Sequence, residues 1–160
     1  MNRLTRSALM VAVVMAGVGM DVIAANAANA PGGKAMAWIR FEKAAKSYSG
    51  VPYIYLGEDQ IDLKIDVKPA KGQVLDILWG SKKDTRTAAV IVNGTSQTVE
   101  GGGYKGFRWK RVTLPADLNG ETFRVTIKQA GRKAAFIAEV RLTDPAGKGG
   151  AAKDAACKIT

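Results

Sequence analysis

Alternation of apolar and polar residues along the chain predicts a series of β-strands. In residues 60–68 each apolar side chain is followed by a charged one, and the apolar set is Ile61, Leu63, Ile65 and Val67. A period of two places successive side chains on opposite faces, so this strand has one buried face and one solvated face. Residues 74–79 are more apolar, as in a central strand, and Leu75, Ile77 and Trp79 share one face. The pattern therefore predicts a layered β-structure.

The strongest turn signal is Asn93-Gly94, which separates β-forming residues 88–92 from residues 95–99. Both central residues of a type I′ turn need positive φ, which Asn and Gly tolerate best. Ser47–Gly50 is turn-like, and residues 51–56 are rich in β-formers and predict a strand. Pro52 confines this strand to a sheet edge, or is itself among the strand's first residues. We expect a β-hairpin centred on Asn93 and further turns near residues 69–72, 117–120 and 130–133.

Two late segments continue the alternation. Residues 122–128 place Phe123, Val125 and Ile127 on one face, and residues 134–142 predict a last strand with Phe136, Ala138, Val140 and Leu142 inward. The first strand is expected at 37–43, with a short helix through 42–46 as an alternative for its end. Eight or nine short strands with regular turns and no helical period predict an all-β fold, an antiparallel β-sandwich or barrel.

The two ends of the chain differ from this central domain. Residues 1–27 combine a basic start, an apolar run at 8–19 and a small-residue cleavage pattern ending at Ala27, as in a signal peptide. We therefore expect a periplasmic or secreted protein that contacts a membrane only before cleavage. Residues 28–36 read as a lead-in and 37–143 as the β-sandwich. Residues 144–160 lack periodicity and large apolar groups, so we expect a flexible tail or a linker to a further domain.

Composition excludes several kinds of chemistry. The 160 residues contain no His and one Cys, Cys157, so a His-based site or an intrachain disulfide is not expected. The carboxylates at Glu42, Glu58, Asp59 and Asp76 do not assemble into a hydrolase pair from sequence, and we expect no enzyme activity. The net charge of +10 is spread along the strands, which favours solubility over specific nucleic-acid binding.

The order of these elements resembles the galactose-binding-like jelly rolls, and within them the carbohydrate-binding modules of families 6 and 35. The matching features cover most of the chain after the leader: an acidic residue at Glu42, Pro69-x-x-Gly72, Val90-x-Val92-Asn93-Gly94, Trp109-x-x-Val112 and the apolar strand 137–142. The resemblance implies a non-catalytic domain that binds a poly- or oligosaccharide in loops through aromatic rings. A pyranose has an apolar face of C–H groups that stacks on such rings.

The resemblance also implies site residues. The ligand-binding candidates are Trp79, Asp84, Arg86, Asn93, Tyr104, Phe107 and Trp109. Tyr104 is the best of them because it lies in a glycine-rich loop. A core position is favoured for Trp79, and a surface ion pair is the commoner explanation of Asp84 with Arg86. Where the family often carries an Asn, this chain has Gly131-Arg132-Lys133. Glu42 and Asp144 are the candidate ligands of a structural calcium, and no other cofactor is expected.

Two other readings of the function remain open. One is a structural or protein-interaction β-sandwich of a larger envelope or secreted protein with no sugar ligand. The other is nucleic-acid binding through basic loops and aromatic stacking, which the predicted export signal disfavours.

Overall fold

The computed structural model describes residues 32–116, 118, 120–146 and 155–160, and the statements below refer to these. The described chain contains strands and no helix. The strands are β1 (Lys34–Arg40), β2 (Lys46–Tyr48), β3 (Val51–Tyr55), β4 (Ile61–Ile65), β5 (Val74–Lys82), β6 (Arg86–Val92), β7 (Thr95–Gly101), β8 (Lys105–Thr113), β9 (Phe123–Gln129), β10 (Phe136–Asp144) and β11 (Ala155–Ile159). None of the described residues forms a helix long and apolar enough to span a membrane.

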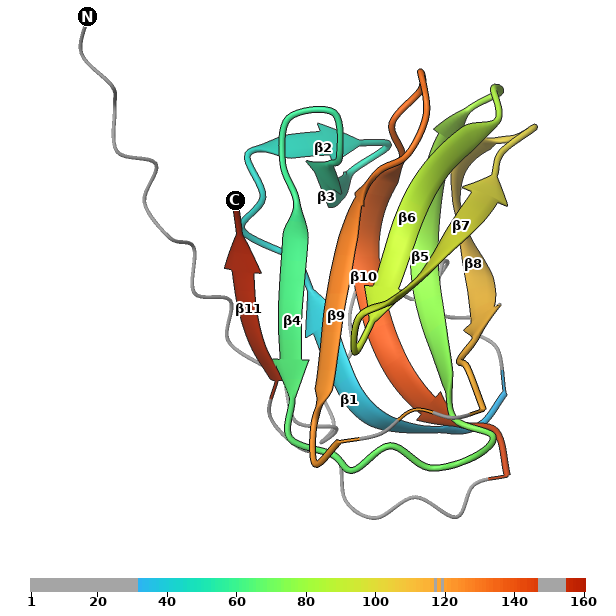
Figure 1. The fold of residues 1–160 in the computed structure, drawn as a ribbon. Helices are drawn as coiled ribbons and strands as arrows, with labels where there is room; N and C mark the ends of the chain where they lie inside the picture. Colours follow the sequence, from blue (N-terminus) through green and yellow to red (C-terminus); the bar gives the residue numbers. More distant parts are fainter. Residues whose placement is uncertain (1–31, 117, 119, 147–154) are drawn as a thin grey trace, which may run out of the picture.

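The strands form two facing antiparallel sheets (Figure 1). The first sheet has the order β2-β3-β10-β5-β8, and β1 also pairs with β10. The second has the order β11-β4-β9-β6-β7. The predicted all-β antiparallel sandwich is therefore confirmed.

Four strand pairs are nested within one another along the chain. The innermost is the β6–β7 hairpin, followed outward by β5–β8, β4–β9 and β1–β10. The pairs β5–β8 and β1–β10 belong to the first sheet, and the other two belong to the second. The chain therefore crosses between the layers repeatedly, and loops from distant parts of the sequence meet at each end of the sandwich.

The core lies between the sheets, where the alternation predicted it. Ile61, Leu63 and Ile65 are buried from β4, and Phe123, Val125 and Ile127 from β9. From β5, the side chains of Leu75, Ile77 and Trp79 are fully buried in the same cluster. The predicted hairpin is also present, because Asn93 and Gly94 both have positive φ, 47° and 89°.

The predicted inward face of the last strand is wrong in its first half. A β-bulge between Ile137 and Glu139 inserts one residue into β10 relative to β5. The insertion reverses the alternation, so Ile137 joins the main core while Phe136 and Ala138 belong to a separate apolar cluster on the outer side. Val140 and Leu142, beyond the bulge, do face inward as expected.

The end of the chain also departs from prediction. Residues 155–159, expected as part of a flexible tail, form β11 and pair with β4 from Ala155↔Ile65 to Ile159↔Ile61. Gln60 and Thr160 exchange backbone hydrogen bonds of 2.6 and 3.0 Å. A short strand of small residues has little signal of its own, because its stability comes from a partner about 100 residues earlier.

The other boundaries shift by a few residues. The first strand begins at Lys34, within the expected lead-in, and the alternative helix over 42–46 is not formed. The segment at Ser47 contributes to β2 instead of being only a turn. The predicted signal peptide, residues 1–27, lies outside the described residues.

Candidate functional site

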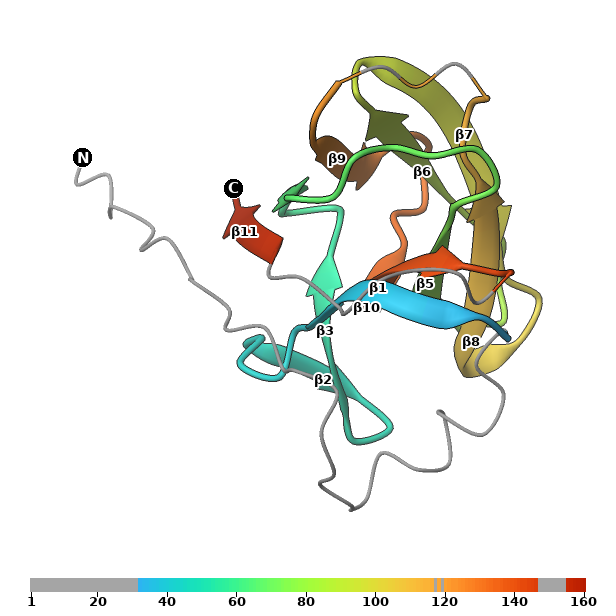
Figure 2. The same ribbon diagram turned by 90° about the horizontal axis from the view of Figure 1, so that it is seen from below.

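The outer face of the first sheet carries an apolar cluster that is separate from the sandwich core. Its buried members are Leu78, Phe107, Phe136 and Ala138, and the partly buried side chains packed on them are Tyr48, Val51, Tyr53, Tyr55 and Trp109. Figure 2 shows the β2–β3 hairpin standing on the side of this sheet that faces away from the second sheet. The cluster is therefore an aromatic layer on the outside of the sandwich.

Local sequence explains why the hairpin can lie there. Tyr48 pairs with Val51, so Ser49 and Gly50 form a two-residue turn with φ of 52° and 76°. Alternation along β3 directs Val51, Tyr53 and Tyr55 to one side of the hairpin. The tyrosines lie against Phe136, whose ring centroid is 4.7 Å from that of Tyr53 and 5.6 Å from that of Tyr55.

Gly80 of β5 leaves room for the ring of Phe107, on the neighbouring strand β8, to join the layer. A Cβ atom on Gly80 would lie 2.6 Å from the ring of Phe107 and 2.8 Å from Cβ of Phe136. Because Gly80 pairs with both residues across β5, it leaves space for the two rings to cover the sheet. Tyr48 and Tyr53 then reach Phe107 at centroid distances of 6.3 and 6.1 Å.

Cationic side chains surround one end of this layer. A depression of about 210 Å³ is lined by Lys46, Tyr53, Tyr55, Lys82, Arg86 and Phe136, and we name these six residues the basic aromatic pocket. The guanidinium of Arg86 lies 4.3 Å from the ring centroid of Phe136, and the ammonium groups of Lys46 and Lys82 lie 5.0 Å from Tyr55 and 5.6 Å from Tyr48. Cations at this distance are attracted to the aromatic faces.

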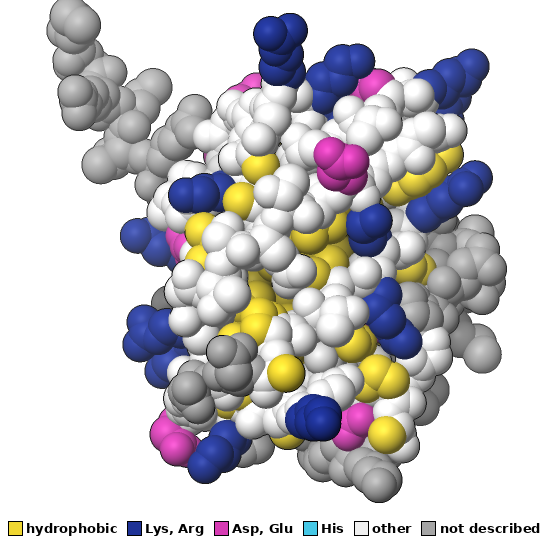
Figure 3. Space-filling view, turned by 45° about the vertical axis from the view of Figure 1, so that its right-hand side comes forward, with side chains coloured by type: hydrophobic (Ala, Val, Ile, Leu, Met, Phe, Trp, Pro, Cys, Tyr) yellow, Lys and Arg dark blue, Asp and Glu magenta, His cyan; other side chains and the backbone are white. Residues whose placement is uncertain are grey.

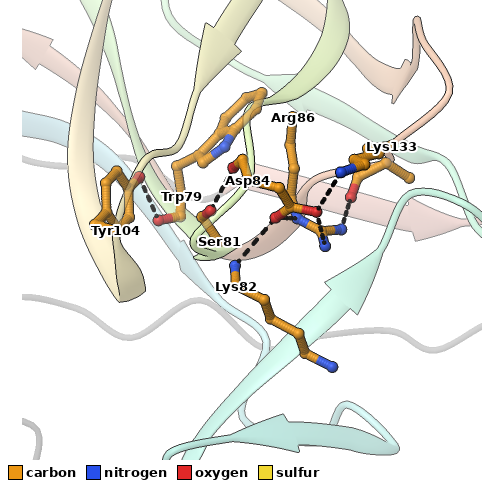
Figure 4. A network of polar contacts seen from close by, with 8 residues as sticks. Trp79, Ser81, Lys82, Asp84, Arg86, Tyr104 and Lys133 are labelled. Carbon is orange, nitrogen blue, oxygen red and sulfur yellow. Dashed lines mark hydrogen bonds and ion pairs between the residues drawn. The ribbon is translucent and has the colours of Figure 1, made fainter.

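The three cations differ in how far their charge is compensated. Arg86 makes two 2.9 Å hydrogen bonds to Asp84 and a third, of 2.6 Å, to the carbonyl of Ala134. Lys46 is paired with Glu58 at 2.5 Å. For Lys82 no carboxylate of the described chain lies within ion-pair distance of Nζ; its side chain extends away from Asp84 toward the β2–β3 hairpin (Figure 4).

Asp84 holds the turn between β5 and β6. It accepts from Arg86, lies 3.4 Å from Nζ of Lys133 and accepts a 3.4 Å bond from the backbone N–H of Lys82 (Figure 4). Burial by itself raises the pKa of this carboxyl group, but the hydrogen bonds and charge of Arg86 outweigh it and the pKa is lowered overall. Asp84 is therefore a carboxylate that positions Arg86 at the pocket.

Next to the aromatic layer, on which Trp109 packs, two tryptophans and two arginines form a stack. We name it the arginine–tryptophan ladder, and its members are Arg40, Trp38, Arg141 and Trp109. Arg141 lies 4.1 Å from the ring centroids of both Trp38 and Trp109, and Arg40 lies 3.9 Å from Trp38. Buried Glu139 accepts a 2.6 Å bond from the Trp38 indole and lies 3.3 and 3.4 Å from the two arginines. The ladder fixes one face of Trp109 against Arg141.

A second depression lies at the open edge between the sheets, where β7 and β8 end their layers. This edge groove has a volume of about 520 Å³ and is lined by Thr85, Glu100, Gly101, Gly102, Tyr104, Arg108, Trp109, Lys110 and Arg111. Figure 3 turns this side forward and shows apolar atoms between backbone and projecting lysine and arginine side chains. Tyr104 is only partly exposed there, because its hydroxyl donates to the carbonyl of Trp79 at 3.1 Å and Arg108 covers its ring at 4.6 Å.

The structure separates the ligand-binding residues expected from sequence. Arg86 lines the basic aromatic pocket, Phe107 floors the aromatic layer, and Asp84 and Trp109 lie next to them. Tyr104 lies instead in the edge groove. Trp79 is 0 % exposed and so presents no ring face to a ligand.

Asn93 lies at the other end of the sandwich. The seven residues of β6 separate it from Arg86, which is roughly 20 Å at about 3.3 Å per residue. Its side chain donates to the carbonyl of Thr122 at 3.1 Å and accepts from the N–H of Arg124 at 2.7 Å. These bonds join its turn to the segment that enters β9, so Asn93 has a structural role.

The pair expected to hold calcium is not brought together. Lys34 pairs with Asp144, while Arg40 pairs with Glu139, so Glu42 follows the opposite end of β1 from Asp144. At about 3.3 Å per residue the two carboxylates are roughly 20 Å or more apart, and they cannot share one ion. Among the described residues no three acidic or Cys side chains form a group suited to a metal ion.

Several residues of the pocket and of the aromatic layer were not identified from sequence. Tyr48, Tyr53, Tyr55, Lys46 and Lys82 lie on β2, β3 and β5, and Phe136 was assigned to the core. Ser49-Gly50 between residues rich in Tyr was a usable signal for a hairpin with aromatics on one side. The face of Phe136 was not predictable, since the bulge that turns it outward has no local signature.

No family model, curated protein or solved structure matches this chain. The geometry of the outer face of the first sheet is therefore the guide to its function. Two features of that face matter most: the rings gathered outside the core, and Lys82, for which no carboxylate of the described chain lies within ion-pair distance of Nζ.

Proposed function

We propose that this protein is a non-catalytic glycan-binding domain and that the basic aromatic pocket is its sugar site. The observation that carries the proposal is the aromatic layer outside the core, formed by Tyr48, Tyr53, Tyr55, Phe107 and Phe136. An outer sheet face is ordinarily polar. Here Phe107 and Phe136 are buried beneath the β2–β3 hairpin, while Tyr48, Tyr53 and Tyr55 stay partly exposed, and apolar groups gathered at a surface in this way are typical of a binding site.

The chemistry of the layer suits a sugar. The three tyrosines are only partly buried, so each combines an apolar ring with a hydroxyl that can bond a sugar hydroxyl. The rings are tilted by 39–58° to one another, which makes a faceted surface and not a flat stacking platform. A puckered pyranose with C–H groups and hydroxyls on different faces is complementary to such a surface.

The strand order supports the predicted jelly-roll assignment. The nested pairs β6–β7, β5–β8, β4–β9 and β1–β10 alternate between the two sheets, as expected when one long hairpin is rolled into a sandwich. This inference concerns topology. It agrees with the resemblance to carbohydrate-binding modules, while the proposed site is on the sheet face and not in the loops.

The carboxylates around the pocket support a binding role without catalysis. Glu58 is paired with Lys46, and Asp84 is paired with Arg86 and Lys133. A glycosidase needs two carboxyl groups on either side of the bond that is broken, one of them protonated. Two carboxylates held by cations are poorly suited to that chemistry. On the leader sequence at residues 1–27 we also propose that the domain acts outside the cytoplasm.

Affinity gel electrophoresis with a panel of neutral and acidic polysaccharides tests the proposal. We expect retention by at least one polysaccharide, and loss of that retention in Tyr53→Ala. Lys128→Met, on the second sheet, should remain retarded. Tyr104→Ala distinguishes the two depressions. If Tyr104→Ala loses binding while Tyr53→Ala keeps it, the site lies in the edge groove.

A structural interaction domain is the second candidate. The specific observation in its favour is the same apolar layer, which another protein domain could cover. Absence of binding to every polysaccharide, together with a partner domain that protects Tyr53 from solvent, would favour it over glycan binding.

A further inference from the structure

The lysines and arginines of the pocket bear on the kind of glycan that the site takes. Within the described chain, Arg86 is satisfied by Asp84 and Ala134, and Lys46 by Glu58. Lys82 is exposed, and its ammonium lies 5.6 Å from the ring centroid of Tyr48 and 5.5 Å from that of Phe136. The rings position this charge but do not neutralise it.

Resting on the proposed glycan-binding function, we infer that the pocket selects an anionic sugar unit, carrying a carboxylate or a sulfate group, and that Lys82 determines this selection. A neutral sugar would leave the ammonium of Lys82 without a counter-charge beside an apolar surface. An anionic substituent makes a charge-assisted hydrogen bond there, which is roughly twice as strong as a neutral one.

The arrangement of rings and cations favours an acidic sugar over a nucleic-acid base. Bases stack on exposed flat ring faces. Here Lys46 lies over Tyr55, Lys82 over Tyr48 and Phe136, and Arg86 over Phe136, so these ring faces already carry cations. Tyr53 has no described cation over its ring and is partly exposed, so it is the ring for the C–H face of the sugar.

The size of the pocket also favours a single sugar unit or its charged substituent. Its volume of about 210 Å³ is below the range of about 300–1,000 Å³ for sites that enclose a drug-sized molecule. It suits one unit or one charged substituent of a longer chain that continues over the aromatic layer. The anionic group would lie at Lys82, with Arg86 as a fixed positive wall held by Asp84.

Matched polymers test this inference. One pair is polygalacturonate and its methyl ester, which share a backbone and differ in charge; the other is dextran sulfate and dextran. Binding is measured by isothermal titration calorimetry for the wild type, Lys82→Met, Lys82→Gln and Lys128→Met. Lys128→Met removes the same charge from an exposed position on β9, outside the pocket.

We expect at least tenfold tighter binding of one acidic polymer than of its neutral partner. Lys82→Met and Lys82→Gln should remove about tenfold of that affinity, and Lys128→Met less than twofold. Which pair shows the difference identifies the group as carboxylate or sulfate. Unchanged melting temperatures for the Lys82 variants, whose side chain is exposed, establish that the loss is not unfolding.

Three results would overturn the inference. If acidic and neutral polymers bind equally and the Lys82 variants bind as tightly as the wild type, the selection of an anionic sugar is refuted, and glycan binding remains. Equal losses in Lys82→Met and Lys128→Met, or equally tight binding of an oligothymidylate, show only polyanion attraction to a basic protein. No binding of any polymer by the wild type means that the proposed function itself fails.

Discussion

Asp84, in the turn between β5 and β6, accepts two hydrogen bonds of 2.9 Å from Arg86, the first residue of β6. The pair is largely buried, with side-chain exposures of 23 % and 10 %. Its geometry is that of a planar guanidinium bound by both carboxylate oxygens, which is the strong form of this interaction. Because Arg86 also covers Phe136, the pair joins the turn to the aromatic layer.

The first prediction concerns the stability of this pair. Asp84→Asn leaves the buried charge of Arg86 without its counter-ion and should lower the free energy of unfolding by about 3 kcal/mol at pH 7. The folded-state pKa of Asp84 is lowered, so its stabilisation is complete above the ordinary pKa of 3.8 and is lost as the pH falls below it through the folded-state value. Urea unfolding of both proteins from pH 7 to 2.5 should show the difference narrowing at low pH, whereas a constant difference would contradict this account.

The second prediction concerns the planar group of the arginine–tryptophan ladder. Arg141→Lys keeps the positive charge but removes the flat guanidinium between Trp38 and Trp109. At about 0.5–1 kcal/mol for each cation–aromatic contact, the loss should be about 1–2 kcal/mol. Arg108→Lys is the control, since Arg108 is exposed and lies over the single ring of Tyr104. Thermal unfolding followed by tryptophan fluorescence measures the stability of both variants. Equal destabilisation by Arg141→Lys and Arg108→Lys would contradict the contribution assigned to the ladder.

The third prediction separates two neighbouring glycines before Tyr104. A Cβ atom on Gly102 would lie 2.0 Å from the carbonyl oxygen of Asp84 and 2.7 Å from Cα of Thr85. Gly102→Ala should therefore displace the β5–β6 turn and destabilise the fold by about 3 kcal/mol or more. Gly103→Ala meets nothing within 4 Å and carries only the strain of its φ of 77°, about 1 kcal/mol. A lower urea midpoint for Gly103→Ala than for Gly102→Ala would refute the predicted clash of a Gly102 Cβ atom with the β5–β6 turn.

The fourth prediction concerns the thiol of β11. Burial raises the pKa of Cys157 to about 12 from an ordinary 9.0, and Asp62 adds to the rise. At pH 8 the thiolate population is therefore about a thousandfold lower than for an exposed thiol. A disulfide reagent should label Cys157 at least a hundredfold faster in urea than in the native protein. Rapid native labelling would show that β11 does not stay paired with β4.

The site was less predictable than the fold for reasons visible in single residues. Phe107 and Trp109 were among the ligand-binding candidates that the family resemblance implied, and both belong to the outer apolar cluster. Tyr104 was ranked first because it lies in a loop, but its hydroxyl is bonded to the backbone of β5. Local sequence cannot tell a loop ring that is exposed from one that closes a sheet edge.

The sequence by itself determined the strands other than β2 and β11, the Asn93-Gly94 hairpin and the buried faces of β4, β5 and β9. These features depend on alternation and turn chemistry within a few residues, so they can be predicted from local sequence. The tertiary structure decided that Phe136 faces outward, that β11 completes the second sheet, and that Lys82 meets rings from β2 and β10. Each of these depends on contact between segments far apart in the chain, and no local pattern records which strand a given residue will meet.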